Sequence, residues 1–324
     1  MRPPILVTGA AGFIGHAVCV RLAADGADIL AVDNFDPYYE PALKRDRAAR
    51  LAAAGVVVRA LDIAEPAALA ALASAAGVTR VVHLAAQAGV RHSMAAPFAY
   101  QHANLAGHLS VLECCRHLPG FEHLVYASSS SVYGDRPDAG GRFHEDDRVD
   151  RPASLYAATK RSCELMSECY AGLYGIPQSG LRFFTVYGPW GRPDMAYFAF
   201  TRRILAGEPI DVYGEGRMRR DFTYIDDIVD GILGVLARPP DRGTQRLLNI
   251  GNDRPETLMH FIALLEGALG REALKRLLPM QSGDVTETWA DIGRIRSLTG
   301  YAPGVALHEG LPRFVAWYRD RYGG

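Results

Sequence analysis

The sequence predicts an α/β fold: a Rossmann-type, doubly wound parallel sheet with a smaller C-terminal α/β domain. Three observations favour this fold. Short apolar runs alternate with longer helix-like segments through the first part of the chain, and the first run leads directly into a glycine-rich turn. Beyond about residue 188, the segment "YGPWGRPD" introduces loops and shorter elements marked by Pro and Gly, which indicates a second domain.

Each apolar run is taken as one strand. The strands are predicted at 5–9, 28–33, 56–62, 81–86, 123–129 and 179–188. Several are apolar almost throughout, as expected when helices cover both faces of a parallel sheet. Helices are predicted at 13–25, 66–76, 97–117 and 154–174, with a short element at 209–216 and a last helix at about 307–322. We expect a first domain over 1–188, with returning segments near 223–251, and a second formed mainly by 189–324.

Composition and charge are those of an ordinary globular protein. The chain has 324 residues, of which 49% are hydrophobic and 22% charged, and its net charge is −1. We therefore expect no nucleic-acid partner and no membrane association, because no apolar run approaches the roughly 18 residues of a spanning helix. The opening "MRPPILVTGAAGFIG" reads as a first strand and not as a signal peptide.

Cysteine and histidine usage indicates neither a disulfide framework nor a metal site. The five cysteines form no C-x-x-C motif, and the ten histidines show no metal-ligand spacing with Cys or Asp. Reduced, mostly buried thiols in a cytoplasmic protein are the expected arrangement.

The glycine-rich turn predicts a dinucleotide site in the first domain. "VTGAAGFIG" places Gly9, Gly12 and Gly15 between a strand and a helix, where glycines let the backbone approach a pyrophosphate. The spacing differs by one residue from the usual fingerprint, and a chain with 33 glycines also offers ordinary turns by chance. Context favours the dinucleotide, because Asp33 ends the second strand 18 residues after Gly15 and can bind an adenosine ribose.

NAD is favoured over NADP as the cofactor. Asn34 and Phe35 follow Asp33, and the pair provides no Arg for a 2′-phosphate. Ligands of such sheets bind at the carboxyl ends of the strands. We assign to this site Gly9, Gly12, Phe13, Ile14, Gly15, Asp33, Asn34, Asp62, Ile63, Leu84, Ala85, Ala86, Asn104, Tyr156 and Lys160.

A tyrosine and a lysine are candidates for acid–base chemistry. "LYAATKRSCEL" places Tyr156 and Lys160 four residues apart at the start of a predicted helix, so they share a face. A nearby ammonium lowers the pKa of a phenol and makes it a usable general base. On its own the pair is more typical of a solvated helix surface, and its place downstream of the dinucleotide fold and the serine strand favours the catalytic interpretation.

Longer strings carry a resemblance to a known family. The chain resembles the extended short-chain dehydrogenase/reductase superfamily, and within it the UDP-glucuronate 4-epimerases. The strings are "NFDPYYEPALKRDR", "AAQAGVRHS", "SSSSVYG", "RFFTVYGPWGRPDMA", "RRDFTYIDDI" and "PMQSGDV". The resemblance implies a tightly held NAD, a transient ketone at sugar C4, a homodimer paired through helices, and conversion of UDP-glucuronate to UDP-galacturonate without decarboxylation.

Three alternatives to that activity remain open at this point. A 4-epimerase of neutral sugars such as UDP-glucose or UDP-N-acetylglucosamine usually carries Asn where Thr185 stands. A UDP-glucuronate decarboxylase resembles "STSEVYG", with an acid at the position of Ser131. An NAD-binding protein without catalysis would not need Ser129, Tyr156 and Lys160 together.

The resemblance implies a role for each group of the catalytic centre. Ser129 hydrogen-bonds the sugar 4-hydroxyl while Tyr156 takes its proton, and Lys160 holds the nicotinamide ribose. Hydride leaves C4 for NAD and returns to the other face of the ketone.

The serine run, with Thr185, is expected to bind the substrate carboxylate. Related dehydratases and decarboxylases carry acids near Ser130 and Ser131. The neutral hydroxyls of Ser129, Ser130, Ser131 and Thr185 add no charge and can hold the carboxylate by hydrogen bonds. Without the resemblance, a strand end that caps its own backbone is the alternative.

Positively charged side chains are expected to bind the anionic part of a UDP-sugar. The resemblance makes Arg220 the best phosphate ligand and places Arg192 on the phosphate or sugar side. Gln281 and Asp284 are expected at the uridine ribose. Arg91 is a candidate for the carboxylate or a loop contact, and a solvated surface position is equally consistent.

Overall fold

A parallel sheet forms the centre of the protein. The structure is a computed structural model that describes residues 3–134, 141–280 and 285–323. The strands are β1 (Ile5–Thr8), β2 (Ile29–Asp33), β3 (Val58–Ala60), β4 (Arg80–His83), β5 (His123–Ser129), β6 (Gln178–Phe183) and β10 (Gln245–Ile250). They lie in the order β10-β6-β5-β4-β1-β2-β3, so the chain reverses direction across the sheet between β1 and β4. Such a switch point is where doubly wound sheets bind ligands.

Helices cover both faces of this sheet and make two separate cores. One face carries α3 (Pro66–Ala76), α6 (Gly107–His117) and α7 (Leu155–Tyr174), and the other carries α1 (Phe13–Ala24), α9 (Ile225–Leu236) and α11 (Gly293–Thr299). Leu6 and Leu124 enter the first core, whereas their neighbours Val7 and Val125 enter the second. Both faces of the sheet are therefore shielded from solvent, which explains the continuous apolar runs in its strands.

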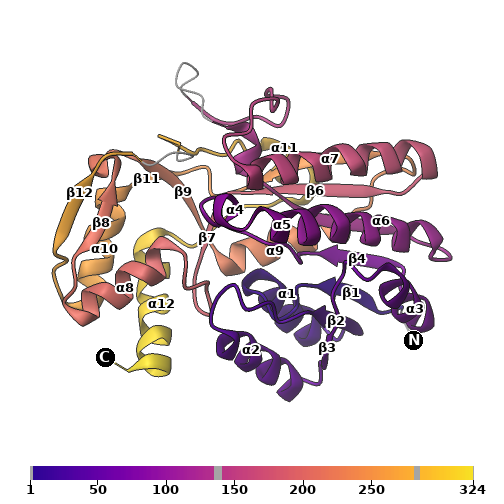
Figure 1. Cartoon of the computed structure of the whole chain (residues 1–324), viewed down its shortest axis with the longest axis horizontal. Helices are drawn as coiled ribbons and strands as arrows, with labels where there is room; N and C mark the ends of the chain where they lie inside the picture. Colours follow the sequence, from indigo (N-terminus) through magenta and orange to yellow (C-terminus); the bar gives the residue numbers. More distant parts are fainter. Residues whose placement is uncertain (1–2, 135–140, 281–284, 324) are drawn as a thin grey trace.

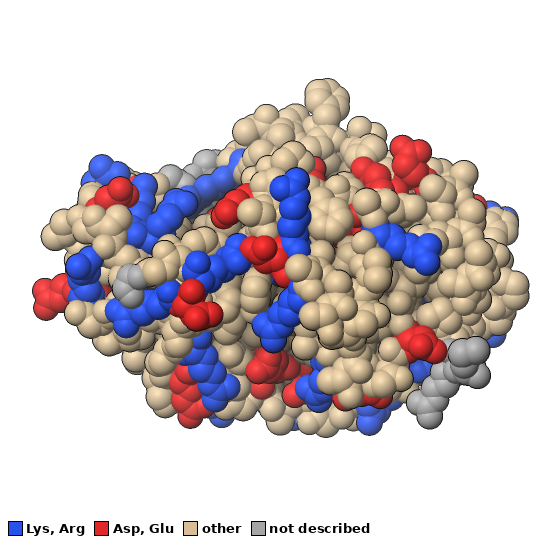
Figure 2. All heavy atoms as spheres, turned by 90° about the horizontal axis from the view of Figure 1, so that it is seen from below, with Lys and Arg blue, Asp and Glu red and all other residues tan. Residues whose placement is uncertain are grey.

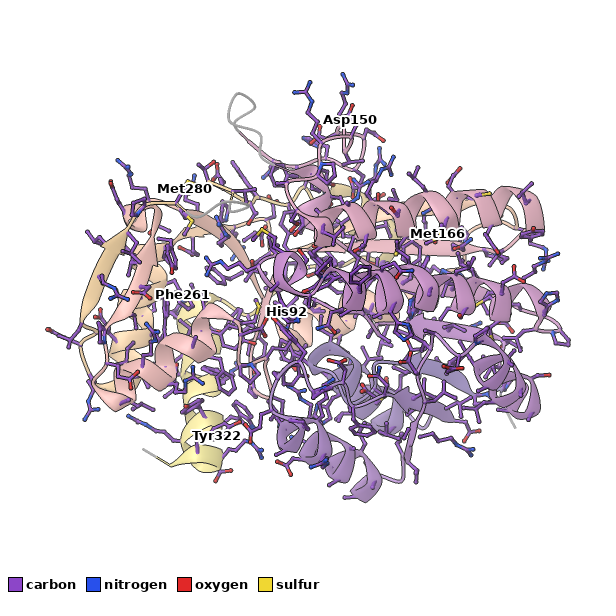
Figure 3. All side chains as sticks on the ribbon, viewed as in Figure 1. His92, Asp150, Met166, Phe261, Met280 and Tyr322 are labelled. Atoms are coloured by element: carbon purple, nitrogen blue, oxygen red, sulfur yellow. The ribbon has the colours of Figure 1, made fainter. Side chains whose placement is uncertain are left out.

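A smaller second part lies beside the carboxyl ends of the central strands, at the left of Figure 1. It contains a three-stranded sheet of β7 (Thr185–Tyr187), β9 (Arg219–Tyr224) and β11 (Pro255–Thr257), and a two-stranded sheet of β8 (Ile210–Tyr213) and β12 (Lys275–Leu278). Its helices are α8 (Ala196–Ala206), α10 (Leu258–Leu269) and α12 (Leu307–Tyr322). Phe261 of α10, labelled in Figure 3, stacks on Phe222 of β9 with ring centroids 4.8 Å apart.

The remaining helical elements are short or irregular, apart from α2, and most of them contribute residues to the space between the two parts. They are α2 (Pro41–Ala53), α4 (His92–Ala95), α5 (Pro97–Tyr100), a π-helical stretch at Gln101–Ala106, and short 3₁₀ turns at Ser130–Tyr133 and Gly214–Gly216. Within the described residues, no helix is long and apolar enough to cross a membrane.

Most predicted elements are confirmed, and two differ in an informative way. The strand expected at 179–188 is two strands, because the chain leaves the central sheet at Phe184 and β7 joins a different sheet. The helix expected at 97–117 is divided into α5, the π-helical stretch and α6. Apolar periodicity reports which residues are buried. It does not report which sheet a strand joins, or where a helix changes to a π-helical stretch, so neither break is visible in the pattern.

A buried ion pair ties β5, β6 and α7 together. Arg182 of β6 donates from Nε to Glu164 Oε1 at 2.8 Å and from a terminal nitrogen to Oε2 at 3.0 Å. The two side chains are 1% and 0% exposed, so each charge depends on the other. Ser128 of β5 also donates to Glu164 Oε1, at 2.7 Å.

Removing one charge of this pair should cost far more than removing a neighbouring surface charge. Glu164→Gln leaves the Arg182 guanidinium buried without its carboxylate and should lower the free energy of unfolding by about 3–5 kcal/mol. Arg161 contacts the same carboxylate but its side chain is 31% exposed. Arg161→Gln is the matched control and should cost about 1 kcal/mol or less. Urea unfolding measures both; a Glu164→Gln cost no larger than that of the control would contradict the analysis.

Candidate active site

One large cavity lies between the two parts of the protein, at the carboxyl ends of the central strands. Its volume is about 940 Å³. His92, labelled near the middle of Figure 3, is part of its wall where the two parts meet. The structure brings to this cavity the predicted site residues Gly9, Gly12, Phe13, Ile14, Gly15, Asp33, Asn34, Asp62, Ile63, Leu84, Ala85, Ala86, Arg91, Ser129, Ser130, Ser131, Tyr156, Lys160, Thr185, Arg192 and Arg220. Gln281 and Asp284 lie outside the described residues.

The glycine turn is bare backbone for a steric reason. A Cβ on Gly15 would lie 2.0 Å from the carbonyl oxygen of Gly9, and one on Gly9, whose φ is 72°, would lie 2.7 Å from Ala85 N. Helix α1 begins at Phe13 with no side chain capping its first turn. The N–H groups of that turn and the helix dipole therefore suit a diphosphate, and the absence of side chains lets it approach.

Acidic side chains border the cavity beside the glycine turn. Asp33 accepts hydrogen bonds from Ala11 N at 3.0 Å and from Phe35 N at 2.8 Å, which fixes its carboxylate beside the glycine turn. Lys44, which sequence reasoning missed, lies with Nζ 4.0 Å from Asp33 Oδ1. Asp62 accepts from Asn34 Nδ2 at 3.2 Å. This set of donors and acceptors fits the adenosine half of a dinucleotide.

All four serines border the cavity, and the first of them is also anchored within the fold. The Ser128 hydroxyl is engaged by Glu164, as described above. Ser129 Oγ donates to Ser131 Oγ at 3.1 Å and accepts from Ser131 N at 3.2 Å, so it begins the 3₁₀ turn. This turn breaks the strand alternation, and Ser129, Ser130 and Ser131 all border the cavity.

Helix α7 brings Tyr156 and Lys160 to the same wall. Lys160 Nζ donates to the carbonyl oxygen of Ala127, at 2.9 Å, close to the serine run. The Tyr156 ring packs edge-on against Tyr100, with centroids 6.1 Å apart. A phenol, an ammonium and serine hydroxyls on one wall are the groups that proton transfer at a sugar hydroxyl requires.

Asn104 lies behind this wall and does not border the cavity. Its Nδ2 donates to Thr159 Oγ1 at 3.0 Å, and Thr159 Oγ1 donates to the carbonyl oxygen of Tyr156 at 2.8 Å. Asn104 also exchanges hydrogen bonds with the backbone of Gln87, a residue of the wall. In this structure Asn104 supports the helix turn that carries Tyr156.

The opposite wall carries cationic side chains whose positions are set by neighbours. Arg192 pairs with Asp194 through two contacts, of 2.6 and 3.1 Å. Tyr38 donates to Asp194 at 3.1 Å; burial, then the Asp194 charge, raises the Tyr38 pKa to about 12. The Arg91 guanidinium lies 4.8 Å from the centre of the Tyr213 ring, which joins the two parts of the protein.

Arg220 lies at the far end of the cavity. It donates to the carbonyl oxygen of Val285 at 2.7 Å and to that of Thr286 at 3.3 Å. These contacts fix the guanidinium beside the segment that follows residue 284. An arginine held in this way suits planar contact with a phosphate.

Sequence reasoning missed several residues that hold the site together, namely Tyr38, Lys44, Arg47 and Asp194. All four lie inside strings that carried the family resemblance, "NFDPYYEPALKRDR" and "GPWGRPDMA", so the signal was present without a role attached to each residue. Among the described residues, no cluster of His, Cys, Asp and Glu could hold a metal ion.

Comparisons with known proteins agree with this geometry. The NAD dependent epimerase/dehydratase family matches residues 5–251. A probable UDP-glucuronate 4-epimerase of Rhizobium meliloti is 45% identical, with 98% of this chain and 97% of the relative covered. UDP-glucuronate 4-epimerase 1 of Arabidopsis thaliana is also 45% identical, with 98% and 77% covered. The crystal structure of the Bacillus cereus UDP-glucuronic acid 4-epimerase with UDP-glucuronic acid and NAD superposes with a TM-score of 0.91, at 34% identity and 98% and 100% coverage. The chain therefore belongs to the NAD-dependent epimerase/dehydratase family.

Proposed function

We propose that this protein inverts the configuration at C4 of UDP-glucuronate and yields UDP-galacturonate, through a 4-keto sugar and without loss of the carboxylate. The observation that carries this proposal is the single cavity that joins a dinucleotide-type glycine turn to Ser129, Tyr156 and Lys160. NAD, when bound, supplies a hydride acceptor and then returns the same hydride to the sugar.

The wall that carries the glycine turn, the serines and the start of α7 holds NAD and places its nicotinamide near the sugar. Gly9, Gly12 and Gly15 leave the first turn of α1 open to the diphosphate, and Asp33 suits the adenosine ribose. Lys160 suits the nicotinamide ribose, because it extends from the same wall as the serines.

Tyr156 accepts the proton of the 4-hydroxyl while the hydrogen on C4 departs as hydride, so that the C4–O bond becomes a carbonyl. Ser129 holds the same oxygen by a hydrogen bond throughout. Once the ketone has turned its other face to the cofactor, Tyr156 returns the proton to the oxygen. The net change is inversion at one carbon, and no proton or electron is gained or lost.

Neutral donors keep the intermediate from decarboxylating. A 4-keto glucuronate is a β-keto acid, which loses carbon dioxide when its carboxylate lies perpendicular to the ketone plane. Ser130, Ser131 and Thr185 border the cavity beside Ser129 and offer hydroxyls to the carboxylate. Held by these groups, the carboxylate stays out of the orientation that releases carbon dioxide.

The anionic nucleotide is assigned to the second part of the protein. We place the diphosphate at Arg220 and the sugar side at Arg192, with Arg91 as a second contact near the sugar. Gln281 and Asp284 are proposed at the uridine ribose. This division gives a dinucleotide domain of 1–188 with returning segments near 223–251, and a nucleotide-sugar domain formed mainly by 189–324.

Incubation of the purified protein with UDP-glucuronate, followed by proton NMR of the nucleotide sugars, tests the function. We expect UDP-galacturonate to accumulate until an equilibrium mixture is reached, because the reaction changes one stereocentre only. Accumulation of UDP-xylose would identify a decarboxylase instead. Conversion of UDP-glucose without conversion of UDP-glucuronate would identify a neutral-sugar epimerase, and no conversion of either would identify a protein that binds NAD without catalysis.

An acid at position 131 should disturb the proposed carboxylate site. Ser131→Glu places a negative charge beside the substrate carboxylate, so we expect kcat/KM to fall at least tenfold, about 1.4 kcal/mol. The fraction of pentose nucleotide among the products should rise. Ser74→Glu on the exposed surface of α3 is the matched control. An unchanged rate and product ratio in Ser131→Glu would refute the role of the serines.

We further propose a cytoplasmic homodimer paired through α6 and α7. Leu109, Leu165 and Leu173 on these helices are 41%, 55% and 67% exposed, which leaves an apolar face for a second copy. Leu165→Glu should convert a dimer into a monomer in analytical ultracentrifugation. Leu277→Glu is the control, since Leu277 is 56% exposed on β12, away from these helices. A wild-type monomer at micromolar concentration would contradict the proposal.

A further inference from the structure

A fully buried arginine of α2 links the two sides of the cavity. Arg47 is 0% exposed and does not border the cavity itself. It donates to the carbonyl oxygen of Ala11 in the glycine turn at 3.0 Å. On its other side, it donates to the carbonyl oxygen of Trp190 at 2.5 and 3.1 Å and to that of Gly191 at 3.0 Å. One side chain thus holds segments that lie far apart in the sequence.

The hydrogen-bond acceptors of Arg47 in the described residues are all neutral oxygens. Besides the three carbonyls, it donates to the Tyr39 hydroxyl at 2.7 Å. The charge of Arg47 therefore lies against the glycine turn, whose Ala11 N–H is also bonded to the Asp33 carboxylate. Burial, and then the charges of Arg47 and Arg50, lower the pKa of His16 of α1 to about 3. A dinucleotide diphosphate at the turn would lie beside this buried cation.

The residue that Arg47 holds has a strained backbone. Trp190 has φ of 63°, in the left-handed region that favours glycine. Two guanidinium groups lie over its ring, that of Arg50 at 5.5 Å and that of Arg321 at 5.6 Å from the ring centre. Arg321 is also paired with Asp46 of α2, so α12 completes this enclosure. Strain of this kind persists only where surrounding contacts fix it, and here they do.

Figure 2 shows the molecule from below, with Lys and Arg side chains lying among Asp and Glu on that face. Helices α2 and α12 are nearest the viewer there, since both lie at the bottom of Figure 1. Tyr322, labelled in Figure 3, ends α12 beside Arg321. Arg192, which borders the cavity, follows Trp190 by two residues in the chain.

We propose that Arg47 is a positioning residue that supports the dinucleotide site and the sugar site at once. It fixes the glycine turn through Ala11 and aims Arg192 through the carbonyls of Trp190 and Gly191. The part concerning Arg192 rests on the proposed function, whereas the part concerning the glycine turn does not. Loss of its planar fork should therefore loosen NAD and misplace Arg192 while leaving the uridine end intact.

Arg47→Lys in the NAD-loaded enzyme is the main test, because it keeps the charge but cannot bond two carbonyls with one plane. Arg45→Lys, exposed on the same helix, is the control. We expect the KM for UDP-glucuronate to rise at least fivefold, whereas the inhibition constant of UDP, which lacks the sugar, stays within twofold. The release rate of NAD after dilution should rise at least threefold. The control should match the wild type in all three.

A double-mutant cycle separates aiming of Arg192 from general damage. If Arg47 acts on the sugar through Arg192, then Arg47→Lys should change KM less than twofold in an Arg192→Ala background. Effects that multiply in the double variant would overturn this part of the proposal. So would an inhibition constant for UDP that rises as much as KM, because a loosened fold weakens both.

Two further experiments test the proposal if the main one cannot be carried out. If Arg47→Lys does not fold, Arg50→Gln removes one guanidinium from the Trp190 ring at an exposed position and should raise KM two- to threefold with UDP inhibition unchanged. An unchanged KM in that variant would refute the role of the enclosure. If the wild type does not convert UDP-glucuronate, the proposed function fails, and NAD release still decides the coupling: equal rates in Arg47→Lys and Arg45→Lys would refute it.

Discussion

The buried ion pair between Glu164 and Arg182 is the constraint on which the catalytic wall depends. Neither charge has access to water, so the pair holds only while β6 and α7 keep one relative position. Ser128 joins the pair by a short hydrogen bond and brings the end of β5 into the same arrangement. Ser129, Tyr156 and Lys160 extend from these elements. The relative positions of these three side chains therefore depend on an ion pair that does not itself take part in the proposed reaction.

The second wall is held in a different way. Two of its cationic groups lie on loops: Arg192 pairs with Asp194, which Tyr38 also contacts, and Arg91 contacts Tyr213 at the end of β8. Loops are the less constrained part of a fold, and substrate-binding residues commonly lie on them. The protein thus combines a wall fixed by a buried ion pair, from which proton transfer is proposed to occur, with a wall formed partly by loops, at which an anionic substrate is proposed to bind. Arg47 links the glycine turn to the loop that carries Arg192 by direct hydrogen bonds.

The central sheet and most of the cavity could be predicted from the sequence, and the supporting contacts could not. The run ending at Ser129 was correctly expected as a strand, because its apolar pattern and its length decide its type locally. The contact of Tyr38 with Asp194 and that of Arg47 with Trp190 join residues more than 140 positions apart. Nothing in either segment alone indicates the other. The passage from β6 to β7 was missed for a related reason, since nothing in the run 179–188 marks the point at which the chain changes sheets.

The four serines show that the composition of a segment does not determine the role of each residue in it. Successive side chains of β5 face opposite sides of the sheet, and the hydroxyl of Ser128 is already taken by Glu164. Four identical letters therefore occupy non-equivalent places. Inserting one residue upstream of them would leave four serines in a row, yet it would place a different hydroxyl at the position that now contacts Glu164. Whether a residue stands at an odd or an even position of the strand decides which face its side chain takes, and a row of identical residues does not reveal this.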